Sequence, residues 1–286
     1  MKGLAMESLT GQVAFITGVA RGQGRSHAVR LAEAGADIIG IDSLQDEPTV
    51  HYKLATDTDL EETRALVEKA GRRAVLLRAD VRDLAGIGAA VERGVDELGR
   101  LDVVVANAGI FSMSPLLELE PQMWHAMLAV NLTGVWHTLK AAVPHVRSGG
   151  RGGSVILISS GAALMPPRGI GHYNATKAGV IALAKTLAQE LGPERIRVNA
   201  IAPGNVDTPM IDNDVTRRLF LPHLENPTRA DAEREDSAYV QVNTLPVPWV
   251  DPIDVSSVVE FLASDASRYL TGVVIPVDAG YLLKKN

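Results

Sequence analysis

Short apolar runs alternate with longer amphipathic stretches along most of the chain. Runs such as VVVA and VILIS have almost no polar face, which is typical of parallel strands covered by helices on both sides. The stretches between the runs are long enough for helical, right-handed crossovers. The pattern predicts seven parallel strands, at residues 13–17, 37–41, 74–79, 102–106, 154–159, 197–201 and 273–277.

Two segments interrupt this alternation. Residues 43–58 follow the second strand without helical periodicity, and they are either an insert near a bound ligand or a plain surface loop. Residues 204–251 follow the sixth strand and mix apolar residues with prolines and charges, so we expect a mobile lid over a substrate. No repeat or linker divides the chain. We expect an α/β protein with one domain over residues 1–286, a Rossmann fold whose doubly wound, seven-stranded parallel sheet has helices on both faces.

The composition excludes several classes of protein. The 286 residues carry a net charge of −6 without a long run of like charge, so we expect no nucleic-acid partner. With no cysteine and 7 scattered histidines, we expect no metal site. The longest stretch free of charged residues, 121–139, contains Gln122, His125 and Asn131 and is too polar to span a membrane. No secretion signal precedes the first strand, and we expect a cytoplasmic protein without a membrane partner.

A glycine-rich turn, T-G-V-A-R-G-Q-G over residues 17–24, separates the first strand from a helical stretch. Glycines let such a turn approach a pyrophosphate closely, while the amino end of the helix supplies N–H groups. The G-x-x-x-G-x-G spacing differs from the common G-x-G-x-x-G, and a purely structural turn is the alternative. We expect contacts to a dinucleotide from Gly18, Arg21, Gly22, Gln23 and Gly24.

Asp42 ends the second strand, where a carboxylate can accept hydrogen bonds from an adenosine ribose. NADP carries a phosphate at that position, and a carboxylate at roughly 4 Å would repel it by several kcal/mol. Arg21 could pair with the phosphate, but a flexible arginine can also turn to solvent, so we expect NAD. Further cofactor contacts are expected after the second, third and fourth strands, from Ser43, Leu44, Asp80 (to the adenine amino group), Val81, Asn107, Ala108 and Gly109. Asp80 and the Asn107-Ala108-Gly109 triplet equally suit plain turns.

Tyr173 and Lys177 lie four residues apart in a helical stretch and share one face. Such a pair also arises by chance, but Ser160 ends the fifth strand and Asn131 follows the fourth, so all four can face the crevice at the strand ends. A phenol has a pKa of about 10, which a nearby ammonium lowers. We expect Tyr173 to take the proton of an alcohol whose oxygen Ser160 holds. Asn131 could anchor a water leading to Lys177, or be purely structural.

These motifs resemble the classical short-chain dehydrogenases/reductases over nearly the whole chain, and they follow that family's order. One departure is Ala106, where many members carry an asparagine. The resemblance implies a homotetramer, whereas the apolar helices by themselves allow a dimer equally. It implies that the catalytic residues are Asn131, Ser160, Tyr173 and Lys177, and that the cofactor is also contacted by Tyr173, Lys177, Pro203, Gly204, Val206 and Thr208, with Val206 and Thr208 at the nicotinamide carboxamide.

A finer resemblance comes from the 43–58 segment and from LENPTRADA and LPVPWVDP in the predicted lid. These look like the mycofactocin-associated subfamily, often called carveol dehydrogenases. In that subfamily the insert is thought to bury NAD so that it does not exchange, and mycofactocin removes the electrons. Together with the apolar residues Trp124, Met165 and Trp249, the resemblance suggests a hydrophobic, alicyclic or terpenoid secondary alcohol that is interconverted with its ketone.

Two other functions stay open on these observations. A freely exchanging NADPH-dependent carbonyl reductase would use Arg21 to bind the phosphate, which Asp42 disfavours. A non-catalytic NAD-binding sensor could share the fold, but it would not need the complete set of Ser160, Tyr173 and Lys177.

Overall fold

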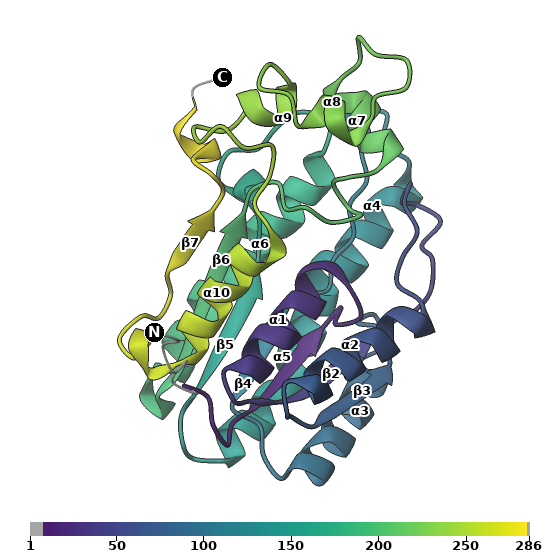
Figure 1. The fold of residues 1–286 in the computed structure, drawn as a ribbon. Coiled ribbons are helices and arrows are strands. Elements are labelled where there is room, and N and C mark those ends of the chain that lie inside the picture. The colour runs from purple at the N-terminus through teal and green to yellow at the C-terminus, as the bar shows by residue number, and fades with distance from the viewer. Residues whose placement is uncertain (1–7, 285–286) are drawn as a thin grey trace, which may run out of the picture.

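One parallel sheet organises the computed structural model, which describes residues 8–284 (Figure 1). Its seven strands have the order β3-β2-β1-β4-β5-β6-β7. The predicted fold class is confirmed, with strand ends that shift by up to a few residues. Residues 1–7 and 285–286, which the predicted domain includes, lie outside the described part. The strands are β1 (Val13–Thr17), β2 (Asp37–Asp42), β3 (Ala74–Arg78), β4 (Val103–Ala106), β5 (Gly153–Ile158), β6 (Ile196–Pro203) and β7 (Val274–Val277).

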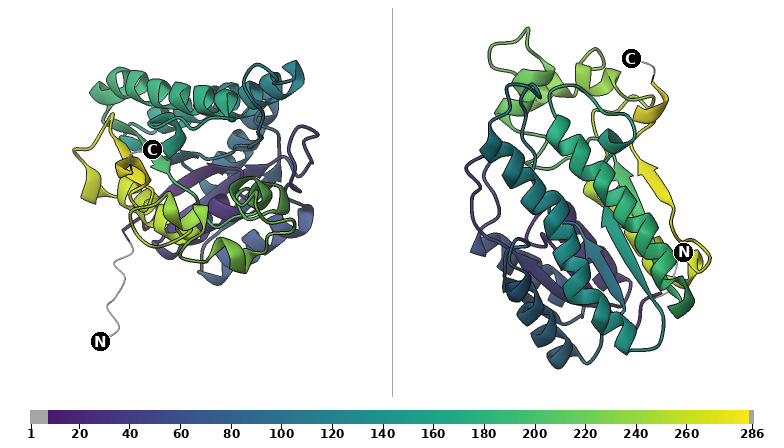
Figure 2. Two further views of the ribbon diagram at one scale, coloured as in Figure 1. Left: turned by 90° about the horizontal axis from the view of Figure 1, so that it is seen from above. Right: turned by 180° about the vertical axis from the view of Figure 1, so that it is seen from behind.

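Helices cover both faces of the sheet, and Figure 2 shows the two layers from above and from behind. Each layer encloses its own apolar cluster, which explains why the strands are apolar on both sides. One layer contains α1 (Gly22–Glu33), α2 (Asp57–Lys69) and α10 (Pro252–Ala263), and the other contains α3 (Leu84–Leu98), α4 (Pro121–Leu128), α5 (Gly134–Ser148) and α6 (Gly171–Leu191).

Short helices fill several connections. A π-helical turn, η1 (Ala129–Thr133), joins α4 to α5, so the helical stretch from Pro121 to Ser148 is widened in its middle. The single-turn 3₁₀ helices are η2 (Gly161–Ala163), η3 (Gly192–Glu194), η4 (Asp265–Ser267) and η5 (Tyr281–Leu283).

The predicted lid, residues 204–251, contains α7 (Asp214–Phe220), α8 (Arg229–Ala232) and α9 (Ala238–Gln241), which lie beyond the carboxyl ends of the strands (Figure 1). Tyr239 and Trp249 pack edge to face at 5.6 Å in a small core that belongs to this segment. Arg229 binds the Asp207 carboxylate at 2.6 Å and covers the Trp249 ring at 4.7 Å. These contacts tie the lid to the chain that leaves β6.

The segment 43–58 is irregular up to Thr56, as its lack of periodicity predicts. Thr56 ends it with a capping box, in which its side chain accepts from Asp59 N and the Asp59 carboxylate accepts from Thr56 N. Helix α2 therefore begins at Asp57, inside the predicted segment.

Two structural features are absent from the described residues, and both absences bear on function. Within residues 8–284, no helix is both long and apolar enough to cross a membrane. The same residues contain no cluster of three or more His, Asp or Glu side chains arranged to hold a metal ion.

A buried histidine lies between α1 and α10. His27 is fully buried, its Nδ1 lies 2.8 Å from Ser256 Oγ, and its Nε2 has no hydrogen-bond partner. Burial lowers the pKa of His27 to about 3. The folded protein therefore keeps this ring neutral at pH values where the unfolded chain binds a proton.

We predict that His27 makes the fold sensitive to mild acid. Because its folded pKa lies below the unfolded value of about 6.5, its contribution to stability is complete above that value and is lost as pH falls. Between pH 7 and 5 the free energy of unfolding should fall about 2 kcal/mol less in His27→Gln than in the wild type. Urea unfolding at both pH values measures this difference. The exposed control His223→Gln should follow the wild type, and equal losses in all three proteins would contradict the prediction.

Candidate active site

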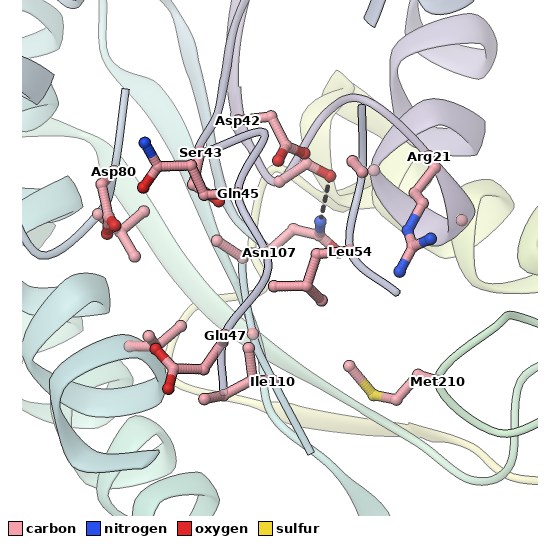
Figure 3. A pocket seen from close by; sticks show the side chains of 18 of the residues that line it. Arg21, Asp42, Ser43, Gln45, Glu47, Leu54, Asp80, Asn107, Ile110 and Met210 are labelled. Atoms are coloured by element: carbon pink, nitrogen blue, oxygen red, sulfur yellow. Dashed lines mark hydrogen bonds between the residues drawn. The ribbon is translucent and has the colours of Figure 1, made fainter. Parts of the chain in front are cut away.

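Two adjoining cavities lie at the carboxyl edge of the sheet. We call one the glycine-turn cleft, because residues 18–24 form part of its wall (Figure 3). We call the other the catalytic cavity, because Ser160, Tyr173 and Lys177 line it. The two share Gln23, Asn107, Gly109, Ile110, Thr208 and Met210, so a ligand can extend from one into the other.

The glycine turn is shaped by close backbone approach. Gly18 and Gly22 have φ of 68° and 55°, which disfavour residues with a side chain. A Cβ at Gly24 would lie 1.9 Å from the Gly18 carbonyl oxygen, so only glycine fits. Asn107 Nδ2 donates to Thr17 O at 2.9 Å and thereby fastens the turn to the end of β4.

Asp42 lies at the end of β2 beside this turn (Figure 3). Its carboxylate accepts from Ala20 N at 3.1 Å and from Leu44 N at 3.4 Å. Burial raises the pKa of Asp42, and these two hydrogen bonds act in the opposite direction. Arg21 donates to the carbonyl oxygen of Lys53 in the 43–58 segment, so its guanidinium is engaged by the protein.

Asp80, predicted to bind an adenine amino group, forms a two-pronged ion pair with Arg82. The shortest of its contacts, from Arg82 Nη2, is 2.6 Å long. Burial acts to raise the pKa of Asp80, but the hydrogen bonds and charge of Arg82 outweigh it, and the pKa is lowered. A ligand would have to share this carboxylate with Arg82.

Segment 43–58 lines the glycine-turn cleft and is fastened at two points in its interior. Glu47 accepts from Arg82 at 2.9 Å, near the end of β3. Tyr52 Oη accepts from Phe111 N at 3.1 Å, beyond β4. Leu44, predicted to contact a cofactor, is instead buried in the apolar cluster beneath α1 and α2. The members of the segment that line the cleft are Ser43, Gln45, Glu47, Tyr52, Leu54 and Ala55.

The residues predicted to be catalytic come from three elements. Ser160 follows β5, and its hydroxyl caps η2 by accepting from Ala162 N at 3.2 Å. Tyr173 and Lys177 lie one turn apart in α6. Lys177 Nζ donates to Ile158 O at 2.9 Å and lies 5.6 Å from the centroid of the Tyr173 ring.

The pKa of the Tyr173 phenol differs from the prediction. Burial raises the pKa of Tyr173, while its hydrogen bond with Ser160 acts to lower it. The Lys177 ammonium is itself buried, which lowers the pKa of Lys177 to about 8. The ammonium donates to the Ile158 carbonyl. The pKa of the Tyr173 phenol is therefore set mainly by its removal from water.

Asn131 lies in the π-helical turn and is fully buried. Its side chain accepts from Ile110 N and donates to Ile110 O, both at 2.8 Å. It therefore binds the backbone after β4 and lines neither cavity. A Cβ at Gly109 would lie 3.4 Å from Asn131 Oδ1 and 3.5 Å from Lys177 Nζ, so Asn131 still belongs to the shell around the catalytic lysine.

Comparison with known proteins agrees with this geometry. The model of the short chain dehydrogenase family matches residues 12–218. The chain is 52% identical over 281 residues to (-)-trans-carveol dehydrogenase of Rhodococcus erythropolis. The alignment covers 98% of this chain and 100% of that relative. The chain belongs to the short-chain dehydrogenase family.

Solved structures of relatives have the same fold. The crystal structure of carveol dehydrogenase from Mycobacterium avium in complex with NAD has a TM-score of 0.94 and 53% identity, covering 97% of this chain and 99% of that one. A short chain dehydrogenase from Mycobacterium paratuberculosis bound to NAD has a TM-score of 0.87 and 42% identity, covering 97% of this chain and 100% of that one.

Most residues singled out from the sequence of this short-chain dehydrogenase lie in one of the two cavities. Besides Leu44 and Asn131, the exceptions are three residues predicted to line an apolar substrate site. Trp249 is buried in the lid core, and Trp124 and Met165 also lie outside the catalytic cavity. The apolar walls are formed by other residues, among them Phe111, Met113, Ile211, Leu219, Phe220 and Val242.

Sequence reasoning missed Tyr52, Arg82, Phe111 and Tyr281. Tyr52 and Arg82 line the glycine-turn cleft, and Phe111 and Tyr281 line the catalytic cavity. Phe111 follows the Asn-Ala-Gly triplet closely and packs edge to face on Tyr173 at 5.1 Å, so its position after β4 was an available signal. No local pattern marks the other three.

Proposed function

We propose that this chain is an NAD-dependent alcohol dehydrogenase that interconverts a hydrophobic, alicyclic or terpenoid secondary alcohol, carveol-like in type, with its ketone. The observation that carries the proposal is the meeting of Ser160, Tyr173 and Lys177 in an apolar cavity that opens into the glycine-turn cleft. The carveol dehydrogenases of Rhodococcus erythropolis and Mycobacterium avium support it through their similarity to the full chain.

The residues of the glycine-turn cleft suit NAD. The turn leaves no room for a side chain at Gly24, as close approach to a pyrophosphate requires. Gln23 Oε1 is buried without a hydrogen-bond partner in the wall shared by both cavities. Of the polar groups of a nicotinamide dinucleotide, a ribose hydroxyl or the carboxamide can donate to this oxygen, whereas the pyrophosphate cannot.

Asp42 favours NAD over NADP because it would repel a 2′-phosphate. Arg21 donates one hydrogen bond to the Lys53 carbonyl, which orients its guanidinium toward the 43–58 segment. The NADPH-dependent reductase, the alternative that relied on Arg21, would have to overcome the repulsion from Asp42.

The reaction assigns one task to each catalytic side chain. NAD, when bound in the glycine-turn cleft, would supply the acceptor for the hydride of the carbinol carbon. Tyr173 removes the hydroxyl proton as general base, or returns it as general acid when a ketone is reduced. Ser160 donates a hydrogen bond to the substrate oxygen. Lys177 stabilises the phenolate while its ammonium is charged, which holds below its pKa of about 8.

Asn131 acts as a positioning residue in this mechanism. Its two hydrogen bonds hold the backbone at Ile110, which lines both cavities. Ser159 Oγ donates to Lys177 O at 2.8 Å and fastens α6 to the end of β5 in the same way. The catalytic side chains are thus set on rigid backbone.

The 43–58 segment is proposed to act as a latch over NAD, with mycofactocin as the acceptor that removes the electrons. The segment lines the cleft and is fastened by Glu47 to Arg82, by Lys53 to Arg21 and by Tyr52 to Phe111. A nucleotide beneath it could leave only after these contacts break.

The proposal includes assembly into a homotetramer in the cytoplasm. Large apolar side chains are exposed on the outer helices, with Trp136 46% and Phe261 40% accessible. Trp136 lies on α5 and Phe261 on α10, on opposite faces of the sheet. Exposed apolar side chains on both faces of the subunit would suit assembly around more than one two-fold axis.

A panel of alicyclic and aliphatic secondary alcohols, assayed with NAD and with an artificial electron acceptor, tests the function. We expect ketone formation from alicyclic alcohols and a faster rate with the artificial acceptor. A protein that binds NAD but oxidises no alcohol with either acceptor would be the non-catalytic sensor.

We predict that Tyr173→Phe lowers the rate of alcohol oxidation by at least about 10²-fold, because it removes the proton acceptor and little else. The amount of bound NAD should stay near that of the wild type. Single-turnover rates and nucleotide content measure the two effects. Tyr269→Phe, at an exposed tyrosine, is the matched control. A Tyr173→Phe enzyme that keeps a tenth of its activity would exclude Tyr173 as the base.

We predict that Asp42→Asn raises the affinity for NADP relative to NAD about tenfold, because it removes a charge while an amide oxygen can still accept from Ala20 N. Dissociation constants for both nucleotides measure the ratio. The exposed Asp96→Asn serves as the control. An unchanged ratio in Asp42→Asn would show that this carboxylate does not face the ribose.

We predict that wild-type protein is purified with NAD bound and turns over slowly with free NAD. The double variant Glu47→Gln/Tyr52→Phe weakens two fastenings of the latch and should release the nucleotide about tenfold faster. The control is Asp57→Asn, which removes the exposed ion pair between Asp57, near the end of this segment, and Arg78. The amount of nucleotide released by denaturation measures the bound NAD, and the rate of exchange with labelled NAD measures its release. Protein that is purified empty and turns over briskly with free NAD would refute the latch.

A further inference from the structure

The catalytic cavity contains positive charge and no negative charge. Among the described residues that line it, the charged side chains are Lys177 and Arg168, and none is Asp or Glu. Lys177 is buried at the catalytic end, where it binds the Ile158 carbonyl. Arg168 has no task in the mechanism, although it and Lys177 are the only charged side chains among the described residues of this lining.

The guanidinium of Arg168 is without a partner in the described part of the chain, where it makes no hydrogen bond, ion pair or ring contact. The arginines of the neighbouring lid behave differently. Arg217 and Arg229 are each paired with more than one carboxylate. Arg168 therefore offers a permanent positive charge and a planar set of donors to a ligand.

The backbone on both sides of Arg168 is fixed relative to the catalytic helix. Asn174 Nδ2 donates to Pro167 O at 2.9 Å, and Ser114 N donates to Gly169 O at 2.9 Å. Asn174 directly follows Tyr173 in α6. The base of the Arg168 side chain thus has a set place in the wall, while the exposed guanidinium can adjust to what it binds.

We propose that the physiological alcohol carries a carboxylate at the end opposite its carbinol carbon, and that Arg168 binds this carboxylate. The inference rests on the proposed function, which places the carbinol oxygen at Ser160 and Tyr173. The apolar walls between the two ends suit a hydrocarbon ring. A guanidinium and a carboxylate form a charge-assisted, two-pronged pair, which a neutral alcohol cannot supply.

The test compares trans-4-hydroxycyclohexanecarboxylate with its methyl ester, two alcohols that share one ring and differ in charge. At low ionic strength the wild-type kcat/KM should be about tenfold higher for the acid, mainly through KM, and the ratio should shrink as salt is added. In Arg168→Gln the acid-to-ester ratio should fall to about one. Arg93→Gln removes an exposed arginine of α3 outside both cavities and should keep the wild-type ratio.

Three results would overturn the inference and leave the proposed function standing. The first is an equal kcat/KM for acid and ester in the wild type. The second is an unchanged acid-to-ester ratio in Arg168→Gln. The third is oxidation of neutral alcohols such as carveol by a wild type that oxidises neither probe. If no alcohol of any kind yields a ketone with NAD or an artificial acceptor, the proposed function itself fails.

Discussion

The winding of the chain reverses between β1 and β4, and the position of both cavities depends on that reversal. β1 pairs with β2 on one side and with β4 on the other, and all pairs are parallel. The connections after β1 and β4 leave the sheet in opposite directions and open a crevice at its carboxyl edge. The glycine turn, Asp42 and Asn107 reach this crevice because each directly follows one of these three strands.

A buried ammonium is the main electrostatic feature of the catalytic cavity. Removing Lys177 from water disfavours its charged form and lowers its pKa to about 8. Hydrogen bonds hold the backbone around it, since Ser159 fastens α6 to the end of β5 and Asn131 fastens the π-turn to Ile110, beyond β4. The raised pKa of Tyr173 shows that this environment by itself favours the neutral phenol. In the proposed reaction, the ammonium has to offset that desolvation.

Two irregular segments lie at the crevice, and charged contacts help to hold both in addition to their apolar packing. Glu47 joins the 43–58 segment to Arg82, and Asp207 joins the chain after β6 to Arg229 in the lid. Contacts of this kind can break and reform without disturbing the sheet. The same sheet therefore carries Ser160, Tyr173 and Lys177 at its carboxyl edge, with two irregular segments beside them.

The strands, the glycine turn and the Tyr173–Lys177 spacing could be predicted from the sequence because each depends on residues close together in the chain. Strands show as apolar runs, the glycine turn follows from its own spacing, and Tyr173 and Lys177 share a face through helical periodicity. The sequence also marked residues 43–58 as a segment without helical periodicity. The residues that hold this segment in place could not be predicted, because contacts such as Tyr52 to Phe111 join residues far apart in the chain.

Side-chain direction was likewise decided only by the tertiary structure. Leu44 turns into the core, Trp249 into the lid, and Asp80 toward Arg82. Each choice depends on packing and charge supplied by distant elements, which residue type and spacing do not contain. The sequence by itself determined the sheet, the glycine turn and the common helix of Tyr173 and Lys177. Only the tertiary structure decided which side chains face the ligand, because burial and ion pairing compete for them across the whole molecule.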